Sequence, residues 1–197
     1  MNKLIILLLV GMLSCSKTPN IDEFFWEIPL DGTSAVINCM VYNIEFKFCL
    51  LNEAGVPATG FKEGEIFSFH FAMINHRKDE LYTIFSHLEC ELPIHHVISM
   101  NHQDTIHLRY RKHSLCPAGI NPQPFYGKDN KREATTHWDE QQIESNNEPG
   151  LKFFHQPPLP AGEYYTEVSP VFMFHVGPNY PFYYIGPLTF KINFKIE

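Results

Sequence analysis

The chain has 197 residues, of which 44% are hydrophobic, including 17 Phe and 9 Tyr residues. This amount of apolar and aromatic material is enough for a packed core, so the composition excludes a disordered chain. The 22 acidic residues outnumber the 15 Lys and Arg residues and give a net charge of −7. This balance argues against a nucleic-acid partner, because non-specific nucleic-acid binding needs a basic surface.

The first residues of the chain have the plan of an export signal. Lys3 precedes residues 4–13, which are apolar throughout, and Ser14 and Cys15 follow them. A helical run of about ten residues is about 15 Å long, roughly half the hydrocarbon thickness of a bilayer. We therefore predict that residues 1–14 form a removable signal peptide rather than a membrane span.

The signal ends with the four residues Met12, Leu13, Ser14 and Cys15. They resemble the lipobox of bacterial lipoproteins, although Met12 stands where that family usually has Leu. The resemblance implies that Cys15 is acylated and anchors an exported protein to a membrane of the bacterial cell envelope. An ordinary secreted protein cut near this point is the alternative. We predict a lipidated Cys and tether over residues 15–33 and a folded domain over residues 34–197.

The rest of the chain is patterned as short strands separated by turns. Apolar residues alternate with polar ones, or form short apolar runs, in segments bounded by Gly, Pro and Asn. We expect strands over residues 43–50, 65–74, 81–85, 105–112, 151–154, 164–176 (with a break at Pro170) and 188–196. Residues 128–150 are polar and are expected to form a long loop. Many short strands at this spacing predict an all-β fold, an antiparallel β-sandwich or barrel.

Three features in chain order support the sandwich. The turn and aromatic strand Gly-Glu-Ile-Phe-Ser-Phe over residues 64–69 leads to Asn75, Trp138 follows, and Pro-Ala-Gly-Glu-Tyr comes later over residues 160–164. This layout resembles the immunoglobulin-like domains of bacterial envelope proteins, and in particular the bacterial intracellular proteinase inhibitor type. The resemblance implies an immunoglobulin-like β-sandwich. It also raises an alternative function, inhibition of a protease by a protruding loop.

Four cysteines follow Cys15, and an even number in an exported chain favours disulfides. We expect a disulfide between Cys90 and Cys116, which flank a polar, His-rich segment, and a second one between Cys39 and Cys49. Four reduced thiols are the alternative. No C-x-x-C motif occurs in the sequence, so neither a zinc knuckle nor a redox pair of that type is indicated.

Two surfaces are candidates for ligand binding. Alternation along one strand would place a cationic row on one side, suited to carboxylates, sulfates or phosphates: His107, Arg109, Arg111 and His113. Four aromatic residues lie between two Gly-Pro pairs, where they would stack on sugars or fill a partner's pocket: Tyr180, Phe182, Tyr183 and Tyr184. The alternatives are a charged edge strand that resists aggregation and aromatic side chains that fill the core.

Motifs for chemistry are missing from the sequence. It contains no G-x-S-x-G elbow, P-loop, H-E-x-x-H or G-x-G-x-x-G motif. The eleven histidines have no spacing that predicts a metal site. We therefore expect no cofactor and a non-catalytic binding or assembly module for an envelope protein or glycan. A protease-inhibitor-like domain and a hydrolase without a visible motif are the alternatives.

Overall fold

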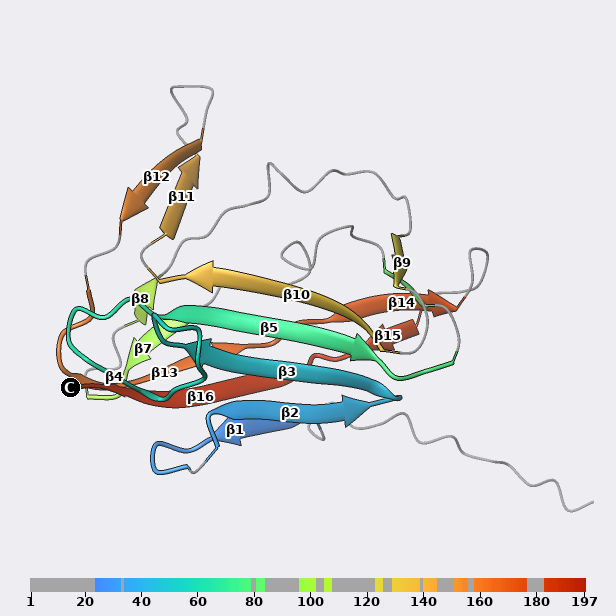
Figure 1. Cartoon of the computed structure of the whole chain (residues 1–197), viewed down its shortest axis with the longest axis horizontal. Helices are drawn as coiled ribbons and strands as arrows, with labels where there is room; N and C mark the ends of the chain where they lie inside the picture. Colours follow the sequence, from blue (N-terminus) through green and yellow to red (C-terminus); the bar gives the residue numbers. More distant parts are fainter. Residues whose placement is uncertain are drawn as a thin grey trace, which may run out of the picture.

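The computed structural model describes residues 24–32, 34–78, 81–83, 96–101, 105–107, 123–125, 129–138, 140–144, 151–155, 158–176 and 183–197. These residues form strands, turns and connecting segments, and none of them is helical (Figure 1). Accordingly, this part of the chain has no helix that is long and apolar enough to cross a bilayer.

Two sheets face each other and form a sandwich. One sheet has the order β10-β5-β3-β2, with β2 Val36–Val41, β3 Ile44–Leu51, β5 Ser68–Asn75 and β10 Asn130–His137. The facing sheet has the order β1-β16-β13-β7-β8, and β4 also pairs with β16. Its strands are β1 Phe25–Ile28, β4 Gly60–Phe61, β7 His96–Ser99, β8 Thr105–His107, β13 Gly162–Val168 and β16 Thr189–Ile196. Figure 1 shows the long strands β3 and β5 lying in front of β13 and β16.

Two smaller sheets complete the structure. One has the order β15-β14-β6-β9, with β6 Leu81–Thr83, β9 Gln123–Phe125, β14 Phe172–Val176 and β15 Tyr183–Ile185. The other is the pair β11 Glu140–Glu144 and β12 Leu151–His155, which stands apart from the sandwich in Figure 1.

Alternation along the strands builds the core between the two main sheets. In β3 and β5 every second residue is a buried apolar one, and most of these residues are phenylalanine. The phenylalanine rings interlock across the sandwich: Phe71 lies 5.3 Å from Phe190, and Phe67 lies 5.3 Å from Phe194, measured between ring centroids. Such interdigitation of two inner faces is the basis of a sandwich core.

A tyrosine corner closes one end of the facing sheet. The Tyr164 hydroxyl donates a hydrogen bond of 2.8 Å to the carbonyl oxygen of Pro160, four residues upstream. The Tyr164 ring is buried and stacks on Phe194, with 5.6 Å between centroids. This corner is characteristic of immunoglobulin-like sandwiches. With the two facing sheets, it confirms the expected all-β, immunoglobulin-like β-sandwich.

The strands predicted around residues 43–50, 65–74 and 188–196 are confirmed as β3, β5 and β16, and the break at Pro170 separates β13 from β14. Two expectations need correction. Residues 25–28 were assigned to the tether, but they form β1, which pairs in parallel with β16. Residues 128–150 were expected to be a loop, but they include β10 and β11. The β10 sequence is polar because β10 is an edge strand in which Ala134 is the one buried residue.

Candidate interaction edge

Most of the residues singled out in the sequence lie outside the part of the chain that the structure describes. These are Cys15, Cys90, Arg109, Arg111, His113, Cys116, Tyr180 and Phe182. His107 is the last residue of β8, where it pairs with His96 of β7. Tyr183 and Tyr184 belong to β15, and the side chain of Tyr184 is 66% exposed.

The expected disulfide between Cys39 and Cys49 is wrong, because both are free, buried thiols. Cys39 lies opposite Phe46 in the β2–β3 pair, whereas Cys49 lies three residues further along β3 and opposite Val36. Positions three apart on a strand point to opposite faces, so the two thiols are separated by the sheet. Burial raises the pKa of Cys39 to about 12 and that of Cys49 to about 11, which makes both thiols poor nucleophiles.

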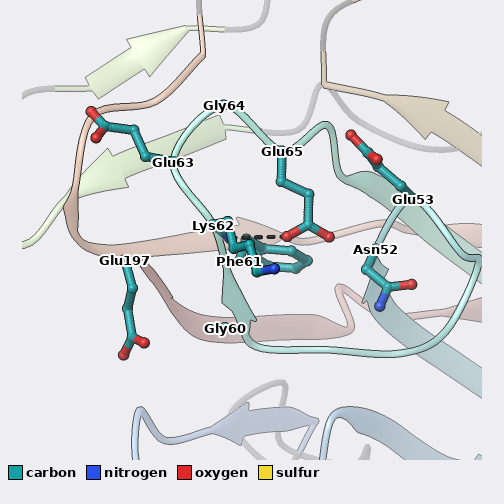
Figure 2. A pocket seen from close by; sticks show the side chains of 9 residues that line it. All are labelled: Asn52, Glu53, Gly60, Phe61, Lys62, Glu63, Gly64, Glu65 and Glu197. Atoms are coloured by element: carbon teal, nitrogen blue, oxygen red, sulfur yellow. Dashed lines mark hydrogen bonds between the residues drawn. The ribbon is translucent and has the colours of Figure 1, made fainter.

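A hollow of about 710 Å³ lies beside β4 and the end of the chain, and four glutamates are among its lining residues: Glu53, Glu63, Glu65 and Glu197. A carboxylate oxygen of Glu65 accepts a hydrogen bond of 2.9 Å from the Lys62 amide, and one of Glu53 accepts one of 3.2 Å from the Ile66 amide. The four carboxylates point in different directions (Figure 2). In the described segments no group of three or more His, Cys, Asp or Glu residues is arranged to hold a metal ion.

A histidine between two carboxylates ties three strands together at the other end of the β10-β5-β3-β2 sheet. His76 follows β5, and its Nε2 lies 2.7 Å from an Oε atom of Glu45 on β3. Its Nδ1 lies 3.0 Å from an Oδ atom of Asp129, just before β10. Hydrogen bonds with Glu45 and then Asp129 raise the pKa of His76. Because carboxylates occupy both ring nitrogens, His76 serves as a structural cross-link rather than a general base.

A serine and a histidine lie side by side on the outer face of the same sheet. The Ser68 hydroxyl oxygen is 2.8 Å from Nδ1 of His137, which lies opposite it on β10. Nucleophilic catalysis by such a pair needs a third group that orients the histidine. Ser68 and His137 form a cross-strand contact of the sheet, and within the described ranges His137 has no carboxylate partner.

Strand β2 is one of the two edge strands of the β10-β5-β3-β2 sheet, and β10 is the other. The backbone of Val36 is turned away from β3, because both its amide nitrogen (3.4 Å) and its carbonyl oxygen (3.0 Å) contact the Ser34 hydroxyl. Backbone groups alternate in direction along a strand, so those of Asn38 and Met40 also point away from β3. These two residues therefore present donors and acceptors at the side of the sheet.

The β2 edge lacks the usual devices that keep sheet edges from pairing. Its sequence, Val-Ile-Asn-Cys-Met-Val, has no charged residue and no proline, and it pairs with β3 residue for residue without a bulge. The side chains of Met40 and of Tyr42, in the following turn, are 54% and 56% exposed. No strand was predicted over residues 36–41. The signal that could have found β2 is this uncharged run, but nothing in the run indicates that the strand lies at an edge.

A groove of about 380 Å³ runs between β2 and β1, the edge strand of the facing sheet. Trp26 and Ile28 of β1 and Val36 and Ile37 of β2 are among its lining residues. The Trp26 ring stacks on Phe190 of the core, with 5.4 Å between centroids. Among the residues that the structure describes, this side of the sandwich therefore combines outward-pointing backbone groups of β2 with apolar side chains.

Comparisons with known proteins show the following. No family model matches this chain, and no curated protein matches it. Among solved structures, it is similar to Northeast Structural Genomics Consortium target SoR45, with 7% identity and a TM-score of 0.35 over 76% of this chain and 86% of that one. It is also similar to the ASH/PapD-like domain 7 of human CEP192, with 11% identity and a TM-score of 0.34 over 86% of this chain and 98% of that one. Both TM-scores are below 0.5, and the fold assignment rests on the sheets and the tyrosine corner.

Proposed function

We propose that this protein is a lipoprotein of the bacterial cell envelope whose sandwich is a non-catalytic binding module for a protein partner. The partner is taken up in extended conformation along β2. The observation that carries the proposal is the uncharged edge strand, in which the backbone groups of Asn38 and Met40 point away from the sheet. The export signal and Cys15 support the location at a membrane surface.

Strand addition suits this edge for a physical reason. An incoming strand satisfies backbone donors and acceptors that otherwise bond to water, at a net gain of about 0.5–1.5 kcal/mol for each hydrogen bond. Its alternate side chains contact the groove beside Trp26 on one side and the exposed Met40 on the other. Affinity then comes from the backbone, and selectivity from these side-chain contacts.

The test is capture of partners from intact cells after cross-linking, with three variants of the full chain. Met40→Lys places a charge at the β2 edge, and we expect it to remove the captured partner. Tyr184→Lys is the matched control, because it also exchanges an exposed apolar side chain for Lys but lies on β15. The edge proposal would be contradicted if Tyr184→Lys or Arg109→Glu lost the partner while Met40→Lys still captured it. That result would instead favour the aromatic or cationic surface expected from the sequence.

The anchor is tested separately with Cys15→Ser. We expect the unchanged chain to sediment with the membrane fraction and to incorporate labelled fatty acid, and the variant to do neither. Unchanged membrane association of Cys15→Ser would contradict lipidation at this residue. The proposal of a binding module would then stand, but without the membrane location.

A further inference from the structure

We infer that the partner taken up at the β2 edge is a second copy of this chain, joined through antiparallel pairing of β2 with β2. This inference rests on the proposed function, because it names the occupant of the same edge. The pairing would join two four-stranded sheets into one continuous sheet across a two-fold axis.

The backbone of β2 is self-complementary. If the two-fold axis passes beside Asn38, the two copies of Asn38 lie opposite each other and Val36 lies opposite Met40 of the second copy. These are the residues whose amide and carbonyl groups point outward. In an antiparallel pair, such residues exchange both of their hydrogen bonds, so each outward group meets a partner. Ser34, whose hydroxyl covers Val36, is exposed and can turn toward water.

The side chains match in the same register. On the outer face, Val36 meets Met40 of the second copy, which covers a side chain that is 54% exposed in the single chain. On the inner face, Ile37 meets Cys39 of the second copy, and both belong to the apolar core. Every one of these contacts is between uncharged side chains, so no charge has to lose water.

The charged residues beside β2 favour a second copy of this chain over a charged partner. Glu45 and Lys47 of β3 are the charged residues opposite β2, and they pair with each other at 3.1 Å. Glu45 is also bonded to His76, so its charge is already compensated. Glu27, which lines the groove beside β2, lies 3.3 Å from Lys191, so among the described groove residues and those opposite β2 a basic peptide would find no uncompensated carboxylate. An uncharged strand such as β2 itself is the matching chemistry.

Repulsion between two copies is small at the interface. Lys47 lies opposite Asn38 on β3, so the two copies of Lys47 would be three strand spacings apart. That is about 14 Å at about 4.8 Å per spacing, which is longer than the screening length of about 8 Å at physiological salt. What remains is the general repulsion between two chains of net charge −7, which added salt weakens. Anchoring both copies to one membrane raises their local concentration and favours the same pairing.

The first test is sedimentation of the full chain carrying Cys15→Ser, at increasing protein concentration and salt. We expect reversible dimers whose dissociation constant falls as salt rises. Asn38→Pro should weaken the dimer at least tenfold, because proline removes an outward amide donor from the edge. Proline is tolerated at such a position, so the variant should remain folded, as circular dichroism and thermal melting will show. Asn38→Ala is the control that keeps the amide and should keep the dimer.

The second test fixes the register. In the proposed pairing, the Cα atoms at position 38 are about 5.5 Å apart, within the range of about 4.4–6.8 Å for a disulfide. Mild oxidation of Asn38→Cys should therefore give a covalent dimer in which the peptide containing position 38 is linked to itself. Tyr184→Cys, at a position that is also exposed but lies on β15 in another sheet, should give none.

Monomers at all concentrations, or dimers that Asn38→Pro does not weaken, would overturn the inference. If a cellular partner is still lost in Met40→Lys, then the proposed function stands and another protein occupies the edge. If neither dimers nor a captured partner depend on β2, both proposals fail.

Discussion

The two edges of the β10-β5-β3-β2 sheet differ in one property, their charge. The β10 edge has the sequence Asn-Lys-Arg-Glu-Ala-Thr-Thr-His, in which Lys131 and Glu133 form an ion pair and Glu133 lies 3.9 Å from His70. The β2 edge has no charged residue. A charged strand resists pairing with another chain because pairing would bury its charges, whereas an uncharged strand pairs at no such cost.

The two edge strands therefore differ in how readily each can pair with another chain, although they belong to one sheet. Both β2 and β10 are supported by the same inner strands, β3 and β5, whose phenylalanine side chains fill the core. The buried phenylalanine side chains of the inner strands stabilise the sheet, and the edge that lacks charge is the one at which we propose binding.

The largest effect should come from a substitution in the inner strands β3 and β5, which lie between the two edges. Phe71 of β5 is 1% exposed and contacts Phe190 of β16 in the facing sheet and Phe172 of β14 in the small sheet. We expect Phe71→Ala to lower the free energy of unfolding by about 3–5 kcal/mol, measured by denaturant titration. A loss below about 1 kcal/mol would show that the core is not packed around this ring.

The next effect should come from removing the charges of β10. In the Asn38→Pro background, where the β2 edge is blocked, we expect Lys131→Val combined with Glu133→Val to create new self-association. A tenfold or greater increase in the association constant, about 1.4 kcal/mol or more, is the expected size in sedimentation experiments. If the double variant stays monomeric, charge is not what keeps β10 from pairing.

A smaller effect is expected from the tyrosine corner, which lies in the facing sheet. Tyr164→Phe removes the hydrogen bond to the Pro160 carbonyl while keeping the ring stacked on Phe194. We expect a loss of about 1 kcal/mol in the free energy of unfolding and no change in association. A change in association would mean that the two sheets do not act separately.

The smallest effect should be the pH dependence of the contact that ties β10 to the inner strands. Hydrogen bonding to Glu45 raises the pKa of His76 in the folded chain. The contact therefore stabilises the folded state fully below the unfolded-state pKa of about 6.5, and this stabilisation is lost as pH rises through the higher folded-state pKa. The same contact lowers the pKa of Glu45, whose contribution is lost as pH falls below about 4.3 toward the folded value. The stability difference between the unchanged chain and His76→Gln should therefore be largest between about pH 4.5 and 6.5.

His70 is the matched control for this pH dependence. Burial lowers its pKa, so it opposes folding as pH falls below about 6.5. The stability difference between the unchanged chain and His70→Gln should consequently change with pH in the opposite direction, followed by thermal melting across the same range. Parallel curves for the two variants would contradict the assignment of His76 as a charged cross-link.

Residue alternation made the inner strands predictable. In β3, β5 and β16 the apolar residues that face the core recur with the two-residue period of a strand, and these residues are buried. The Pro-Ala-Gly-Glu-Tyr segment was singled out only as a turn of the immunoglobulin-like layout, and the structure shows that its tyrosine forms the corner. These features depend on residues close together in the chain.

The edges were less predictable. Residues 130–137 were expected to be a loop because an exposed edge strand has a polar sequence, and β1 was missed because four residues give too little alternation. The proximity of Cys39 and Cys49 in the chain suggested a disulfide, but the register places them on opposite faces of the sheet. None of these outcomes is determined by local sequence.

The amino-acid sequence by itself determined that this chain is all-β, with a phenylalanine-rich core, because alternation and turn residues act over short distances. The tertiary structure alone decided that β2 and β10 are the two edges of one sheet. Edge position depends on which distant strands pair: Phe71 of β5 lies between Phe48 of β3 and Ala134 of β10, sixty-three residues further along the chain. The uncharged run over residues 36–41 becomes an edge strand only through those long-range hydrogen bonds.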